Sequence, residues 1–291
     1  MNTAIWLLRR EFWENRAIWM IPAAIGGLIV IAALFGRVDL MAISSTAPSP
    51  AIGAVFLATL GATFFAVMSI YSTWYLLDCL YADRKDRSVL FWKSMPISDT
   101  ATVMSKLANA LIVIPGVYFA ATDLTALLTA FIISVRAGSS VGVALWRADL
   151  WLQLQALWIY SIATTAIWYL PIAAYLLIVS AWAKRAIMLW SLLPPIALLF
   201  AERWFFGTHV IADQLWERLV GWVPLAFHVN FDDPLWLTAV VDNGTIRTPA
   251  SVWSVLNVGG FFSSAETWIG AAAGAALIAC AIQLRTRRTE I

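Results

Sequence analysis

The chain has 291 residues, of which 62% are hydrophobic and 12% are charged, with 19 Lys and Arg against 17 Asp and Glu. An ordinary soluble domain carries about 25% charged residues, because its water-facing side needs polar cover. The composition excludes a cytoplasmic enzyme, a secreted disulfide scaffold and a disordered tail, and the formal charge of +2 is too small to indicate a nucleic-acid partner. The chain is expected to use lipid as most of its solvent.

Residues 1–16 precede the first long apolar run and are predicted to form an amphipathic helix in the membrane interface. Ile5, Leu8 and Phe12 share one face of such a helix. Its basic residues Arg9, Arg10 and Arg16 can meet anionic lipid head groups. The alternative is a cytoplasmic extension of the first span.

Six apolar runs follow, each long enough for a membrane-spanning helix of about 20 residues. They cover residues 17–36, 52–77, 107–133, 150–183, 186–206 and 267–284. The fourth run is longer than one straight crossing and has room for an interfacial stretch. Only Lys184 and Arg185 separate it from the fifth, which predicts a tight hairpin there. The runs do not alternate as barrel strands would, so the predicted fold class is an all-α integral membrane protein with a single transmembrane domain over residues 1–291.

Six spans place both termini on the same side of the membrane. Of the 19 Lys and Arg residues, 13 fall on that side and six on the other, so the positive-inside rule predicts cytoplasmic termini. The segment 207–265 then lies outside. Leu215, Leu219 and Trp222 recur there at helical spacing, which predicts a membrane-associated helix.

The densest group of polar residues lies in the predicted cytoplasmic loop 78–106. A mixed-sign run from Asp83 to Arg87 is followed by an apolar stretch, 89–92, that is too short to span a membrane. Pro96 ends this stretch, and Ser98 or Asp99 can cap the next helix. The pattern predicts a short amphipathic helix across the cytoplasmic face. It either docks into a groove of another protein or rests on the lipid surface.

Few other residues suggest chemistry. The chain has no phosphate-binding loop with the pattern G-x-x-x-x-G-K-[ST] and no H-E-x-x-H or G-x-S-x-G sequence. His209 and His228 lie 19 positions apart, with Asp213, Asp232 and Asp233 nearby, but the two histidines do not form an i, i+4 pair, so ordinary loop histidines are expected and no metal site. Asp123 is the one carboxylate well inside a predicted span, and it is either a functional group or a structural partner for a neighbouring helix. Gly270 and Gly274 permit close helix approach, within the chain or between chains.

The loop 78–106 resembles the loop between the second and third spans of ABC-2-type transporter permeases. Asp83 and Arg84 match the acidic-Arg start of the family's loop, Ser88 its threonine, residues 95–98 its Leu-Pro-x-Ser motif, and Lys106 its lysine. Arg87 stands where the family commonly has glycine. Six spans, cytoplasmic termini and an interfacial helix before the first span also resemble the family's plan.

The resemblance implies a permease subunit of an ATP-driven transporter, an exporter of hydrophobic or amphipathic substrates in a bacterial inner membrane. The loop then forms a coupling helix on a separate ATPase subunit, and two permease chains pair as a homodimer. Asp83, Arg84 and Arg87 are the implied polar contacts to the ATPase, and Phe91, Trp92 and Met95 its apolar anchors. ATP and magnesium belong to that partner, so this chain is expected to bind no cofactor and to be no enzyme itself. The structural alternative is that some of these residues only hold the loop's own fold.

Three other functions remain open from the sequence. An ion-coupled secondary transporter would depend on Asp123. An integral membrane enzyme would need polar residues converging at one depth, and the sequence offers only scattered ones. The last alternative is a membrane anchor or sensor that transports nothing.

Overall fold

The structure, a computed structural model, describes residues 3–36, 49–85, 98–137, 145–228, 241–242, 245–246, 253 and 255–287. Almost all of these residues are helical, and six helices are long and apolar enough to cross a membrane. The six candidate spans are Ala17–Phe35, Phe56–Lys85, Asp99–Arg136, Ala148–Trp168, Ile187–Phe206 and Ala265–Arg287. The predicted class, a helical multi-pass membrane protein, is therefore confirmed, and the sidedness of the termini stays a prediction.

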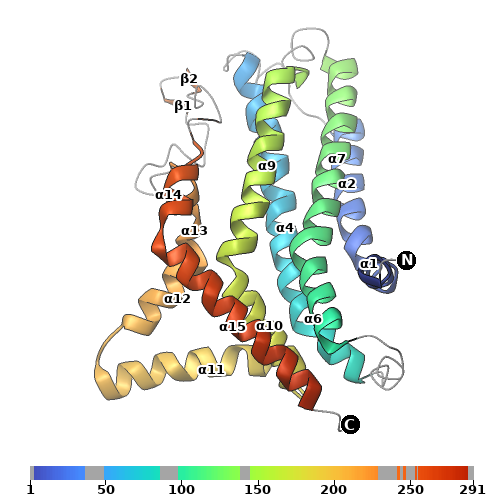
Figure 1. The fold of residues 1–291 in the computed structure, drawn as a ribbon. Coiled ribbons are helices and arrows are strands. Elements are labelled where there is room, and N and C mark those ends of the chain that lie inside the picture. Colours follow the sequence, from blue (N-terminus) through green and yellow to red (C-terminus); the bar gives the residue numbers. More distant parts are fainter. Residues whose placement is uncertain are drawn as a thin grey trace.

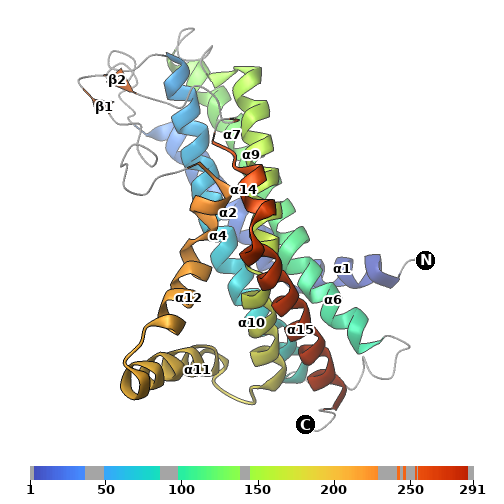
Figure 2. The same ribbon diagram turned by 60° about the vertical axis from the view of Figure 1, so that its left-hand side comes forward.

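The first two helices meet at an angle and lie beside a long third helix. Helix α1 (Thr3–Glu14) lies crosswise to α2 (Ala17–Phe35) and to α4 (Ser49–Lys85) in both ribbon views (Figures 1 and 2). The chain turns between α1 and α2 at Asn15 and Arg16. Within the predicted N-terminal helix, Thr3–Glu14 are thus helical.

The next rod combines α6 (Asp99–Ala108), the π-helical turn η1 (Asn109–Val113) and α7 (Ile114–Ala137). Ser98 caps α6, because its hydroxyl accepts a hydrogen bond from the backbone N–H of Ala101 at 3.1 Å. The wide turn lies just before Pro115, whose missing N–H removes one helical bond. The predicted loop 78–106 is therefore helical at both ends, since α4 continues to Lys85 and α6 begins at Asp99.

The predicted single span 150–183 is two helices. Helix α9 (Ala148–Trp168) ends at Tyr169, whose backbone leaves the helical region with ψ near 4°, and α10 (Leu170–Trp182) follows. Pro171 explains the break, because it has no N–H to continue the α9 ladder. The rod bends at this point, beside the last helix of the chain.

The fifth apolar run, 186–206, does not return along the preceding helix as the predicted hairpin would. It forms α11 (Ile187–Ala201) and the π-helical turn η2 (Glu202–Phe206). Figures 1 and 2 show α11 leaving the base of the bundle crosswise instead of returning along α10. Ala186, in the left-handed region with φ of 50°, sets this exit direction, and no residue of α11 is buried.

Described helices of the segment 207–265 pack back against the bundle. It contains α12 (Val210–Val220), α13 (Trp222–Ala226), a two-residue hairpin of β1 (Val241–Asp242) and β2 (Thr245–Ile246), and α14 (Val258–Ser263). Trp222, which was predicted on a membrane-associated helix, is only 8% exposed. Its ring stacks on Phe65 of α4 and its indole N–H donates to Thr164 of α9 at 3.0 Å, because a buried indole needs a partner for its N–H.

The last helix, α15 (Ala265–Arg287), crosses α10 at close range. A Cβ at Gly274 would lie 2.9 Å from the carbonyl carbon of Leu170 and from the nitrogen of Pro171. Gly270 leaves the space that the Arg218 side chain of α12 fills. The two glycines of the small-residue pattern therefore serve packing within this chain.

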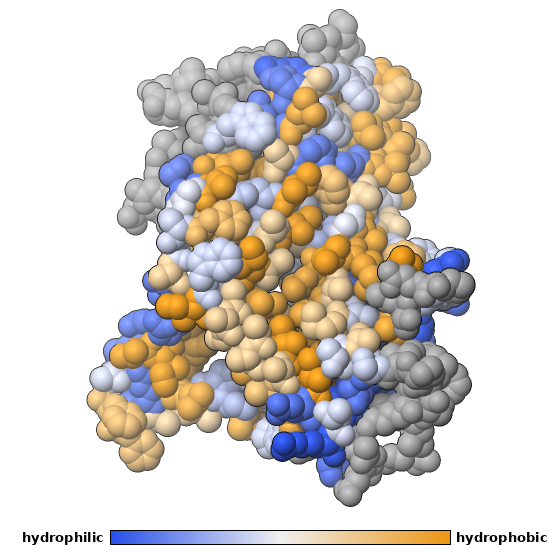
Figure 3. Space-filling model, viewed as in Figure 1, coloured by the Kyte–Doolittle hydropathy of each residue, from blue (hydrophilic) through white to orange (hydrophobic). Residues whose placement is uncertain are grey.

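The outer surface fits a lipid environment. Figure 3 shows hydrophobic side chains over much of the visible face, with hydrophilic ones gathered at the end where α15 finishes. Large apolar side chains such as Leu28, Ile70 and Phe131 are more than half exposed. A water-facing protein rarely exposes so wide an apolar area.

Candidate functional site

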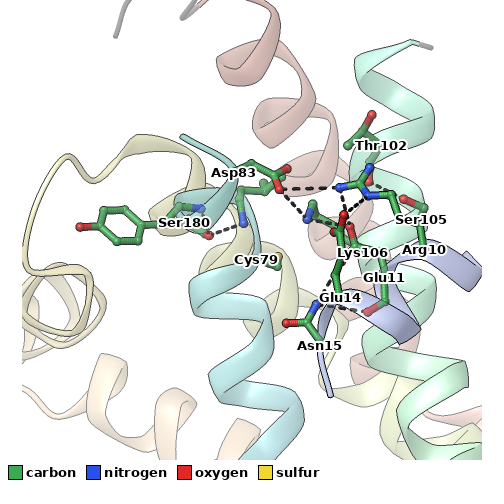
Figure 4. A network of polar contacts seen from close by, with 12 residues as sticks. Arg10, Glu11, Glu14, Asn15, Cys79, Asp83, Thr102, Ser105, Lys106 and Ser180 are labelled. Atoms are coloured by element: carbon green, nitrogen blue, oxygen red, sulfur yellow. Dashed lines mark hydrogen bonds and ion pairs between the residues drawn. The ribbon is translucent and has the colours of Figure 1, made fainter. Parts of the chain in front are cut away.

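Charged side chains from four helices meet in a buried group at one end of the bundle. Figure 4 shows the members that come from α1, α4 and α6. This charge cluster comprises Arg10 and Glu11 of α1, Asp83 of α4, Asp99 and Lys106 of α6, and Arg285 of α15. It lies where α4 ends and α6 begins, at the two borders of the segment 86–97. Its six members are three carboxylates and three bases, and Arg10 also donates to the more exposed Glu14 at 2.9 Å.

Lys106 is the centre of the charge cluster. Its side chain is 3% exposed, and its ammonium donates to Glu11 at 2.9 Å and to Asp83 at 3.2 Å. Lys106 lies in the last turn of α6, and the crosswise direction of α1 brings Glu11 within reach of its ammonium. Glu11 is itself only 2% exposed and also accepts a hydrogen bond from the hydroxyl of Tyr75 at 2.8 Å.

Asp83 connects α6 to the last helix. One oxygen accepts from Lys106, and the other lies 3.4 Å from Arg285. Arg285 in turn donates through Nε to Asp99 at 3.0 Å, and Arg10 lies 4.0 Å from Asp83. The borders of the segment 86–97 are thus tied both to α1 and to α15.

The energetics of such a cluster favour specificity over stability. Removing several charges from water costs several kcal/mol per ion, which the mutual attraction of the charges only offsets when the geometry is good. Loss of one member leaves a buried charge without its partner, which is strongly destabilising. The cluster therefore fixes which helix ends meet, and it resists any motion that separates them.

Arg84, the neighbour of Asp83, binds a different helix. Its guanidinium donates to the carbonyl oxygens of Ser180 and Ala183 at the end of α10. The hydroxyl of Ser180 accepts from the backbone N–H groups of Leu80 and Tyr81, both at 3.0 Å. The end of α4 is therefore also held to α10.

These positions bear on the predicted ATPase contacts. The structure gives Asp83 and Arg84 contacts within the chain, which agrees with the structural alternative for these two residues. Arg87, Phe91, Trp92 and Met95 lie outside the described residues. The role of all six in binding a partner stays a prediction.

Asp123 lies apart from the charge cluster, on α7. Its carboxylate accepts a hydrogen bond of 2.7 Å from the side-chain amide of Gln155 on α9. The amide oxygen of Gln155 is buried without a hydrogen-bond partner. The structure therefore supplies the structural partner on a neighbouring helix that was one of the two expectations for Asp123.

A second polar contact holds the segment 207–265 to the bundle. Arg218 of α12 lies over the ring of Trp168, 4.2 Å from its centroid, and donates to the carbonyl oxygens of Trp168 and Glu266. The indole N–H of Trp168 donates back to the carbonyl of Arg218 at 2.9 Å. Burial lowers the pKa of the Arg218 guanidinium, which still leaves it charged at neutral pH.

Sequence reasoning missed Glu11, Tyr75 and Arg285 as members of one site. Arg285 counted only toward the positive-inside balance, and Glu11 was not singled out within the segment 1–16. Glu11 and Lys106 are 95 positions apart in the chain, Arg285 and Asp83 are 202 apart, and Tyr75 and Glu11 are 64 apart. The available signal was the presence of Asp83 and Lys106 at the ends of apolar runs, where an unpaired charge would be costly.

Among the described residues, no group of three or more His, Cys, Asp and Glu side chains is arranged to hold a metal ion. No protein-family model, curated protein or solved structure matches the chain.

Proposed function

We propose that the chain is the permease subunit of an ATP-driven transporter of the ABC-2 type. The observation that supports this proposal is the charge cluster at the borders of the segment 86–97. In the resemblance described above, that segment holds the coupling helix on which a separate ATPase subunit docks. A permease needs a rigid connection from this helix to the spans that move.

The charge cluster supplies such a connection. Asp83 precedes the segment and Asp99 follows it, and both bind Arg285. Lys106 extends the connection to Glu11 of α1. A displacement of the segment would therefore be shared by α4, α6, α1 and α15, because moving any one of them alone would separate buried opposite charges.

The remaining features of the proposal follow from the same resemblance. The ATPase is a separate polypeptide that carries ATP and magnesium, and a second copy of the chain completes the transport path. The direction is export from a bacterial cytoplasm across the inner membrane. Apolar spans with few charges suit a hydrophobic or amphipathic substrate better than a sugar.

The test is a pull-down of the tagged chain from its native host in a mild detergent, with identification and stoichiometry of the proteins that come with it. We expect an ATPase at one copy per permease chain, and its loss in a triple variant Phe91→Ala, Trp92→Ala, Met95→Ala. The matched control replaces three exposed aromatic residues of η2, Trp204, Phe205 and Phe206, by alanine. Recovery of the complex without any ATPase, under conditions that preserve known transporter complexes, would contradict the proposal.

The second candidate is an ion-coupled secondary transporter. It is favoured by one observation, the hydrogen bond that places the Asp123 carboxylate between α7 and α9 within the span region. It requires no ATPase, and an Asp123→Asn variant would lose transport.

A further inference from the structure

A cleft of ≈ 730 Å³ opens between the α1–α2 turn and one face of α4, next to the charge cluster. This volume lies in the range of small-molecule binding sites, roughly 300–1,000 Å³. Glu14, Asn15 and Cys79 lie around the cluster side of the cleft (Figure 4). Neither the expected coupling contacts nor the helix connections described above account for an open space here.

The lining of the cleft changes in character along α4. It is apolar at Val67 and Ile70, aromatic at Tyr71 and Trp74, and acidic at Asp78. Apart from the neighbours Ile70 and Tyr71, successive residues are three or four positions apart, so they share one face of the helix. From Val67 to Asp78 the helix rises about 16 Å, which is the length of an amphiphile with one polar head and one short hydrocarbon chain.

The polar end of the cleft carries an excess of negative charge. Four carboxylates line it against two basic side chains. The acids are Glu11, Glu14, Asp78 and Asp83, and the bases are Arg10 and Lys106. Glu14 is itself paired with Arg10 at 2.9 Å. Asp99 and Arg285, the remaining members of the charge cluster, add one charge of each sign, so these residues together still carry two more carboxylates than bases. Such a lining attracts a cation and repels phosphate and carboxylate groups.

The aromatic part of the cleft suits the same ligand. Trp74 is 50% exposed and Ile70 is 71% exposed, so both can be reached from the surrounding lipid. Tyr71 and Tyr75 continue the aromatic lining toward the carboxylates. Aromatic faces attract organic cations by about 0.5–2 kcal/mol each, and their bodies bury hydrocarbon.

We propose that this cleft binds an amphipathic cation, an ammonium group on a hydrocarbon chain, that arrives from the adjacent membrane leaflet. The ammonium lies beside Asp78 and Glu14, and the chain lies along Tyr71, Trp74 and Ile70. The proposal goes beyond the transport function, because binding at this site needs neither an ATPase nor a second chain. Its failure therefore leaves the pull-down result untouched, and the reverse also holds.

The test is an equilibrium binding measurement on the full chain in dodecyl maltoside, immobilised on scintillation beads and titrated with tritium-labelled dodecyltrimethylammonium. We expect saturable binding of one probe per chain. Asp78→Asn is expected to weaken it roughly tenfold. Trp74→Leu keeps an apolar side chain but removes the ring, and should weaken binding about threefold or more.

Matched controls on α12 remove a carboxylate charge and an indole ring at positions outside the cleft. Asp213→Asn and Trp216→Leu, both at exposed positions, should leave the affinity unchanged. Dodecanoate, which has an anionic head, should not compete. Competition by added phosphatidylethanolamine would identify a lipid head group as the natural source of the ammonium, and its absence would indicate a free amphiphile.

Three results would overturn the proposal. The first is the absence of saturable binding to the folded parent chain. The second is an Asp78→Asn affinity equal to that of Asp213→Asn. The third is equal competition by dodecanoate and by unlabelled probe, which would show partitioning into an apolar surface without selection for charge.

Discussion

Replacing Lys106 by methionine tests the charge cluster most directly, because methionine keeps an unbranched apolar stem and removes the ammonium group. Two buried carboxylates lose the ammonium that they share, which lies 2.9 Å from the Glu11 carboxylate and 3.2 Å from that of Asp83. Breaking a buried ion pair in this way costs about 3–5 kcal/mol. Asp83 keeps Arg285 at 3.4 Å, and Glu11 keeps the hydroxyl of Tyr75 at 2.8 Å, so we expect the lower end, about 3 kcal/mol.

The assay is the free energy of unfolding of the purified chain, measured by denaturant titration in detergent. Arg147→Met is the control, since Arg147 also pairs with a carboxylate, in Asp149, but both side chains are more than 40% exposed. An exposed pair is worth about 0–1 kcal/mol. A second variant, Glu11→Gln with Lys106→Met, removes one of the stranded charges and should recover part of the loss. The reasoning would be refuted if Lys106→Met cost no more than Arg147→Met.

Three further predictions concern the helix contacts and use the same unfolding measurement except where stated. Gly274→Ala should lower the free energy of unfolding by about 1–3 kcal/mol, because its Cβ would lie 2.9 Å from the backbone of α10. The control Gly116→Ala, which has open space around it, should be neutral or stabilising. Equal effects of the two substitutions would contradict the close approach of α15 to α10. Arg218→Gln removes the stacking on the Trp168 ring and the charged hydrogen bonds to the carbonyl oxygens of Trp168 and Glu266. Amide hydrogen exchange in α12 should therefore become roughly tenfold faster or more. Unchanged exchange would show that other contacts hold that helix. The free energy of unfolding of Asp123→Asn should stay within about 0.5 kcal/mol of the parent, since an amide oxygen still accepts from Gln155. That of Asp123→Leu should fall by about 1–2 kcal/mol. A large loss in the asparagine variant would point to a role for the charge itself.

The membrane character of the fold could be predicted because it depends on the length and composition of single runs. A run of 20 apolar residues is costly in water wherever it lies in the chain, so hydropathy alone finds it. The cap at Ser98 was predictable for a similar reason, since it depends on residues three positions apart.

Direction and pairing could not be predicted in this way. The run 186–206 has the composition of a span, yet hydropathy contains no information on the angle at which α11 leaves the bundle, which the backbone at Ala186 decides. The break after Trp168 had a visible cause in Pro171, but a proline alone does not tell a kinked helix from two helices.

Two members of the charge cluster, Asp83 and Lys106, stood out in the sequence, but as parts of a loop motif and not as parts of one cluster. Asp83, Arg84 and Lys106 were singled out by resemblance, and Lys106 proves to be the central member of the charge cluster. Glu11 and Arg285 were not linked to them, because contacts between distant segments follow from helix packing and leave no local pattern in the sequence.

The order in which the chain is synthesised gives the charge cluster a further consequence. Asp83 leaves the ribosome 202 residues before Arg285, the base that completes its surroundings. Until the last helix is inserted, three carboxylates share only two bases, and the ends of α4 and α6 remain under-neutralised. A nascent or truncated chain that lacks α15 therefore differs from the finished one by a buried charge imbalance, and membrane quality control could distinguish the two on that basis alone.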